Sequence, residues 1–128
     1  MSKALVVDDS KTIRTIIRRI LIGLGHEVLE AENGLAALAI IETEKAAVKL
    51  VLADWNMPVM NGLELVKRLR QDPELTSLKV MMVTTETEIG QMSSALAAGA
   101  NEYIMKPFTK DILQEKLELM GIPVLAAE

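Results

Sequence analysis

Short apolar runs alternate with amphipathic stretches along the whole chain. Five of the runs, each bounded by polar or turn-forming residues, predict β-strands at residues 5–7, 27–31, 50–53, 80–83 and 102–105. The stretches that follow them carry apolar residues at helical spacing and predict helices at residues 13–24, 34–46, 63–70, 88–98 and 111–120. Gly25 and Gly99 are placed to end two of these helices. The chain therefore reads as a strand followed by a helix, five times over.

This alternation predicts the fold class. The strands start 22 to 30 residues apart, close to the length of a βαβ unit, and such units join parallel strands through right-handed crossovers. The runs rich in Val, Leu and Met lack alternating polar residues, which is typical of strands covered by helices on both faces. We expect an α/β fold of flavodoxin-like type: a doubly wound five-stranded parallel sheet in a (βα)5 three-layer sandwich, with residues 1–128 forming one domain.

The composition narrows the functional classes. Half of the 128 residues are apolar, none is cysteine, and the formal charge is -4. The lack of cysteine excludes disulfides and thiolate metal sites, and mild acidity with interspersed charges argues against binding to a nucleic-acid backbone. No run approaches the roughly 18 apolar residues that a membrane span needs, and acids come too early for a signal peptide. We expect a cytoplasmic protein that contacts neither nucleic acid nor membrane.

Polar side chains follow four of the predicted strands, at the sheet edge where open α/β folds bind their ligands. These residues are Asp8 and Asp9 after the first strand, Asp54 after the third, Thr84 and Thr85 after the fourth, and Tyr103 and Lys106 in and after the fifth. Taken singly, each has a structural explanation. An acid such as Asp9, or Ser10 beside it, can cap a helix, a threonine suits a strand, and most lysines are solvated.

The charges favour a functional explanation for the group as a whole. Two carboxylates about 5 Å apart repel each other by roughly 3 kcal/mol at an effective dielectric constant of about 20. Lys106 supplies one positive charge, but three acids require more, and oxygen ligands select a hard cation. A few carboxylates with room for water suit Mg²⁺ better than Ca²⁺. Without a metal, like-charge repulsion should raise the pKa of at least one acid.

A carboxylate nucleophile, a divalent metal, a lysine and a hydroxyl are the groups needed to accept a phosphoryl group and spread its charge. Asp54 is the best candidate nucleophile, because it is the only acid at the tip of the predicted central strand. The sequence therefore indicates that Asp54 is modified by phosphorylation.

At these positions the chain resembles, over essentially its whole length, the receiver domain of two-component response regulators. That family has an acidic pair after strand one, a phosphoacceptor Asp after strand three, Thr or Ser after strand four, and Lys-Pro after strand five. The matching residues here are Asp8 and Asp9, Asp54, Thr84, and Lys106 with Pro107. The segment DWNMP followed by NGLELVKRLR is most similar to the single-domain chemotaxis members of the family.

The resemblance implies a Mg²⁺ cofactor and a set of residue roles. Asp9, Asp54 and the backbone carbonyl of Asn56 would bind Mg²⁺, and Asp8 would act on it through a water molecule. Lys106 would bind a phosphoryl oxygen beside the phosphoacceptor, Asp54.

The resemblance also implies a conformational switch. Thr84 would bind a second phosphoryl oxygen, and Tyr103 would turn inward when Thr84 moves toward the phosphate. The Lys106–Pro107 peptide bond would be cis, as X-Pro bonds alone can be at low cost.

Residues that flank the phosphorylation site set how long the phosphoryl group lasts. Asn56 and Glu86, which lie two residues after Asp54 and Thr84, match the chemotaxis members. Thr85 stands where the family mostly has a small residue, so it should alter the access of water or phosphodonor. Asn61 replaces an Asp that often precedes the glycine of that turn, a change of little expected effect.

The predicted function is a phosphorylation-activated signalling switch, and not an enzyme beyond its own phosphorylation and dephosphorylation. A histidine kinase or a small acyl phosphate donates to Asp54. The face formed by the fourth helix, fifth strand and fifth helix then changes its affinity for a protein target. The resemblance to the chemotaxis members implies a flagellar motor switch component as the leading candidate. A phosphatase is a further candidate partner, and we expect a monomer.

Three alternatives are weighed against this function. A phosphorelay intermediate or phosphate sink shares the chemistry, and the sequence leaves it open. A haloacid dehalogenase-type hydrolase has a second Asp two residues after its nucleophile, where this chain has Asn56. A flavodoxin requires a hydroxyl- and Gly-rich phosphate loop after strand one, where Asp8 and Asp9 would repel the FMN phosphate. The last two rank low.

Overall fold

The computed structural model, which describes residues 3–85 and 90–124, contains a single parallel sheet with the strand order β2-β1-β3-β4-β5. The strands are β1 (Lys3–Val7), β2 (Glu27–Ala31), β3 (Val48–Asp54), β4 (Lys79–Thr84) and β5 (Glu102–Met105). The helices are α1 (Lys11–Gly23), α2 (Gly34–Glu44), α3 (Gly62–Arg70), α4 (Met92–Ala98) and α5 (Lys110–Leu119), with a 3₁₀ turn η1 (Pro73–Leu75). The flavodoxin-like prediction is confirmed.

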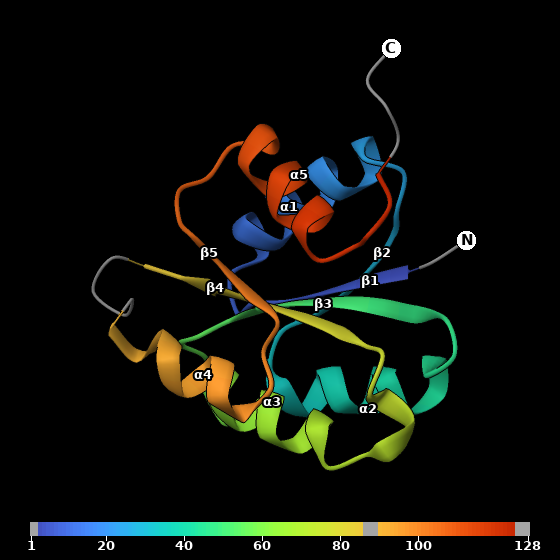
Figure 1. Cartoon of the computed structure of the whole chain (residues 1–128), viewed down its shortest axis with the longest axis vertical. Helices are drawn as coiled ribbons and strands as arrows, with labels where there is room; N and C mark the ends of the chain where they lie inside the picture. Colours follow the sequence, from blue (N-terminus) through green and yellow to red (C-terminus); the bar gives the residue numbers. More distant parts are fainter. Residues whose placement is uncertain (1–2, 86–89, 125–128) are drawn as a thin grey trace.

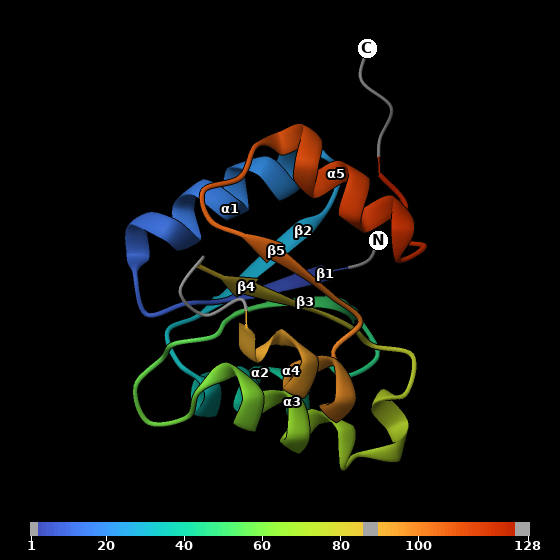
Figure 2. The same cartoon turned by 60° about the vertical axis from the view of Figure 1, so that its left-hand side comes forward.

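The sheet is the middle layer of the sandwich. Helices α1 and α5 cover one face, and α2, α3 and α4 cover the other (Figures 1 and 2). Successive residues of β1 therefore pack into different cores: Leu5 and Val7 face α2 to α4, while Ala4 and Val6 face α1 and α5. All four side chains are buried, which explains why the strand shows no polar alternation. No helix in the described ranges is long and apolar enough to cross a bilayer.

Polar side chains begin four of the five helices by accepting hydrogen bonds from backbone N–H groups that have no partner within the helix. The cap residues are Ser10 for α1, Asn33 for α2, Asn61 for α3 and Thr109 for α5. Asn61 also forms a reciprocal capping box with Glu64. Asn61 therefore has a structural role as the N-cap of α3, which was not predicted from the sequence.

Element boundaries differ from the predictions by a few residues. Strand β3 begins at Val48, two residues before the predicted start. The prediction began at residue 50 because the exposed Lys49 interrupts the apolar run. Gly25 has a φ of 96° just beyond the end of α1, as expected for a glycine that ends a helix. The predicted start of the fourth helix at residue 88 lies outside the described residues.

A half-buried arginine, Arg70, joins the ends of several elements at the edge of the sheet opposite the acidic residues. Its guanidinium donates hydrogen bonds of 2.7–3.0 Å to the carbonyl oxygens of Leu75, Leu78 and Gly99 and to the Asn101 side chain. The same Asn101 Oδ1 accepts the backbone N–H of Val80 at 2.8 Å. Loss of the guanidinium would remove one charge-assisted hydrogen bond from each of these partly buried acceptors, although Asn101 Oδ1 would keep the N–H of Val80.

We expect Arg70→Met to lower the free energy of unfolding by about 2–4 kcal/mol, because partly buried acceptors lose charge-assisted hydrogen bonds. Urea denaturation measures this change. Arg68→Met, on the exposed face of the same helix, is the matched control and should change the free energy by less than about 0.5 kcal/mol. Equal, small effects of both substitutions would contradict the structural role of Arg70.

Candidate functional site

The functional candidates meet at the carboxyl edge of the sheet because parallel strands end on the same side. Asp8 directly follows β1, Asp54 is the last residue of β3, and Lys106 follows β5. The Lys106 Nζ lies 3.2 Å from Asp54 Oδ1 and 3.3 Å from Asp8 Oδ2. The Lys106 ammonium thus contacts two acids that are distant in sequence: Asp8, 98 positions away, and Asp54, 52 positions away.

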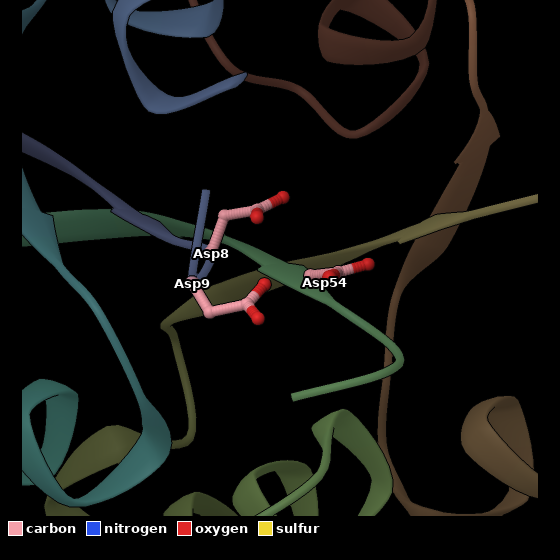
Figure 3. A group of neighbouring side chains, drawn as sticks. All are labelled: Asp8, Asp9 and Asp54. Carbon is pink, nitrogen blue, oxygen red and sulfur yellow. The ribbon is translucent and has the colours of Figure 1, made fainter. Parts of the chain in front are cut away.

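Three carboxylates gather around this point. Each of Asp8, Asp9 and Asp54 offers an oxygen, and these oxygens all lie within 4.8 Å of one another (Figure 3). Asp8 and Asp54 are buried, at 2% and 6% exposure, whereas Asp9 is exposed. Opposite ligands of an octahedral Mg²⁺ ion lie roughly 4.2 Å apart, so small side-chain movements suffice for these oxygens to bind one ion. The donor set fits a hard cation.

The capping alternative for Asp9 is settled by the local geometry. Ser10, and not Asp9, is the N-cap of α1, and its Oγ accepts the N–H of Ile13. Asp8 Oδ1 in turn accepts the Ser10 N–H at 2.9 Å. The turn therefore fixes Asp8 and leaves the Asp9 carboxylate on the accessible side of the cluster.

Arg14 supports this turn and was not singled out from the sequence. Its Nη1 donates to the Asp8 carbonyl at 2.7 Å, and its Nε pairs with Glu30 Oε1 at 3.0 Å. Arg14 thereby ties the β1–α1 turn to the last residues of β2. One turn of helix separates it from Arg18, which contacts the same Glu30 at 3.4 Å.

The electrostatics of the cluster follow from burial and crowding. Burial, and then the charge of Asp8, raise the pKa of Asp54 to about 6, although Lys106 and the Asn56 N–H act in the opposite direction. Burial also disfavours the Lys106 ammonium, but Asp54 and Asp8 outweigh it and raise the pKa of Lys106. The pKa of one acid is raised as expected, but burial contributes more to the rise than the like-charge repulsion that was expected to cause it.

The loop after Asp54 turns sharply. Val59 has a φ of 71°, and the Met60 N–H donates to the Pro58 carbonyl at 2.7 Å across it, which is the geometry of a γ-turn. Such a backbone is strained for a β-branched residue. Gly62 then passes so close to the strand that an added Cβ would meet the Asp54 carbonyl oxygen at 2.6 Å. The close approach of Gly62 therefore keeps the loop of residues 55–61 packed against the end of β3.

The other predicted site residues lie around this cluster. Asp54 is paired with Val83, so the fully buried Thr84 lies one residue further along the neighbouring strand, and its hydroxyl donates to the Thr85 carbonyl at 3.2 Å. Thr85 and Tyr103 are half-buried, and Asn56 is exposed. The Lys106–Pro107 peptide bond is cis, as the resemblance implied. Glu86 lies outside the described residues.

Comparison with protein families identifies the class of protein. A model of the response regulator receiver domain matches residues 4–118. The chain belongs to this family. It is therefore a signalling protein and not a metabolic enzyme.

Individual relatives place the chain more narrowly. It is 51% identical to a chemotaxis protein CheY homolog of Campylobacter jejuni, over 91% of this chain and 89% of the relative. It is 49% identical to chemotaxis protein CheY1 of Helicobacter pylori, over 92% and 95% of the two chains. The structure of Vibrio cholerae chemotaxis protein CheY4 superimposes with a TM-score of 0.85 at 37% identity, over 94% and 98% of the chains. The protein is a CheY-like receiver domain.

The raised pKa of Asp54 leads to a prediction about stability. Because the folded state holds the Asp54 proton more tightly than the unfolded state does, ionisation destabilises the fold as the pH rises from about 4 through about 6. In metal-free buffer, Asp54→Asn should therefore gain stability relative to the unmodified protein, by up to about 3 kcal/mol between pH 4 and pH 7.

Urea denaturation at several pH values measures the difference. The exposed α5 residue Glu115 provides the control, since Glu115→Gln should show no comparable gain with pH. A difference between Asp54→Asn and the unmodified protein that stays constant with pH would show that Asp54 is not destabilised by its surroundings.

Proposed function

We propose that residues 1–128 form a single receiver domain that acts as a phosphorylation-activated switch of a two-component system in chemotaxis. A histidine kinase, or a small acyl phosphate, donates a phosphoryl group to Asp54. The observation that carries the proposal is the contact of the Lys106 ammonium with both Asp8 and Asp54, beside the accessible Asp9. The CheY relatives support the assignment to chemotaxis.

The transfer uses groups of this chain that lie at or next to the acidic cluster. An Asp54 oxygen attacks the phosphorus, and the bond from phosphorus to the donor atom breaks as the new P–O bond forms, with the electron pair leaving on the donor. Lys106 neutralises one phosphoryl oxygen, to which it moves from its carboxylate contacts. The buried hydroxyl of Thr84 donates to another.

Mg²⁺ fits the acidic cluster as cofactor. Asp9, Asp54 and the backbone carbonyl of Asn56 would hold the ion, and Asp8 would act on it through a water molecule. Bound there, the ion neutralises charge that develops on the transferred phosphoryl group. Since the cluster holds three acids and one ammonium, the remaining negative charge favours the binding of a divalent cation.

The output is a change of protein contact. Thr84 moves toward the phosphate and Tyr103 turns inward, which requires up to roughly 5 kcal/mol of differential stabilisation for a nearly complete switch. The α4–β5–α5 face exposes apolar side chains at 40–45% of their surface, which supports a role in protein binding; they are Leu96, Met105 and Ile112. A flagellar motor switch component is the proposed target.

Residues beside the phosphorylation site control how long the signal lasts. Asn56, Thr85 and Glu86 modulate the lifetime of the phosphoryl group, and a phosphatase shortens it further. The protein works as a monomer in the cytoplasm.

Phosphate incorporation tests the acceptor. The unmodified protein should incorporate ³²P from labelled acetyl phosphate when Mg²⁺ is present, and the emission of Trp55, the single tryptophan, should change with beryllium fluoride. Asp54→Asn should remain folded and lose both responses. Undiminished labelling of Asp54→Asn would show that another residue is the acceptor.

Magnesium affinity tests the support of the acidic turn. Arg14→Gln should weaken Mg²⁺ binding by about tenfold, because it removes the donor that holds the Asp8 carbonyl while leaving every metal ligand in place. Titration of Trp55 emission with Mg²⁺ measures the affinity. Arg18→Gln is the matched control, since Arg18 also contacts Glu30, and it should bind Mg²⁺ normally. Equal affinities of the two variants would contradict the role of Arg14.

A further inference from the structure

Lys116 of α5 reaches across to the edge strand β5 and lies over the ring of Tyr103. Its Nζ is 4.8 Å from the ring centroid, within the range of a cation–π contact. The buried residues Leu113 and Leu117 fix the helix against the sheet, and this places Lys116 at the boundary between the core and solvent. Its side chain is only 26% exposed.

Glu102 fixes this ammonium group in position. One oxygen, Oε1, lies 3.2 Å from the Lys116 Nζ and also accepts the backbone N–H of Tyr103 at 3.0 Å. The same carboxylate therefore links the backbone of Tyr103 to the cation that lies on its ring. Glu102 is 21% exposed, so water screens this ion pair less than it screens one on the open surface.

We infer that Lys116, positioned by Glu102, holds the Tyr103 ring in its resting position and thereby sets how readily the switch turns. The inference rests on the proposed function in one respect, that Tyr103 is the residue that moves. Tyr103 is partly buried against the core on the α2–α4 side of the sheet, and a ring that turned further inward would give up its contact with the Lys116 ammonium, which Glu102 holds in place. Loss of the contact should therefore favour the turned state without any change in the acidic cluster.

The single tyrosine of the chain makes the ring directly observable. Protein labelled with 3-fluorotyrosine has one ¹⁹F label, at Tyr103, and its resonance can be followed in the free protein and during titration with beryllium fluoride in the presence of Mg²⁺. Lys116→Met keeps the length of the side chain and removes its charge. Lys116→Arg keeps a cation over the ring, and Glu102→Gln removes the ion pair but keeps an acceptor for the Tyr103 N–H.

In the free protein, Lys116→Met should move the ¹⁹F resonance toward its position at beryllium fluoride saturation. The concentration of beryllium fluoride for half-conversion should fall by about threefold to tenfold, as expected for the loss of one partly desolvated cation–π contact. Glu102→Gln should move both readouts in the same direction, and Lys116→Arg should restore them. Lys110→Met, an exposed lysine on the same helix, should leave both unchanged.

The outcomes separate this inference from the proposed function. If Lys116→Met leaves the resonance and the half-conversion concentration unchanged while the unmodified protein still responds to beryllium fluoride, the inference fails and the proposed function stands. If the unmodified protein responds in neither the ¹⁹F resonance nor Trp55 emission, the proposed function fails. The inference then fails with it, because no switch remains for Lys116 to control.

Discussion

The site depends on carboxylates that the fold buries and gathers at one edge of the sheet, where desolvation and then mutual repulsion disfavour their charges. The parallel strands bring Asp8 and Asp54 together although their like charges repel, and both side chains are buried. One ammonium group, Lys106, contacts both acids but cannot balance them together with Asp9. The site thus gives up stability, and the resulting negative field is what allows a cation and then a phosphoryl group to act there.

The surrounding structure holds this unfavourable cluster in place. Ser10 and Arg14 fix the turn that carries Asp8, and Gly62 lets the loop after Asp54 pack closely on β3. On the far edge of the sheet, Arg70 joins loops that carry no chemistry. Support is therefore distributed around the sheet, and Tyr103 on the edge strand β5 is held by the core on one side and by the Lys116 ammonium over its ring.

Much of the fold and the cluster could be predicted because both follow from chain order. Apolar runs at βα spacing require parallel strands, and parallel strands bring their following residues to a single edge, so Asp8, Asp54 and Lys106 were found without coordinates. The roles of Arg14 and Lys116 were not found. Their partners, at positions 30 and 103, lie on other elements, and nothing in the local sequence distinguishes either residue from a solvated charge. The γ-turn at Val59 was missed because valine is disfavoured in that conformation.

The central claim is that burial and the neighbouring carboxylate of Asp8 hold the pKa of Asp54 well above that of an ordinary aspartate until a cation binds. Calorimetric titration with Mg²⁺ at pH 6, repeated in buffers of different ionisation enthalpy, counts the protons released on binding. Since the pKa of Asp54 is about 6, the account predicts the release of about half a proton per Mg²⁺ at this pH and almost none at pH 8. Mg²⁺ binding without proton release at pH 6, or no Mg²⁺ binding at all, would contradict it.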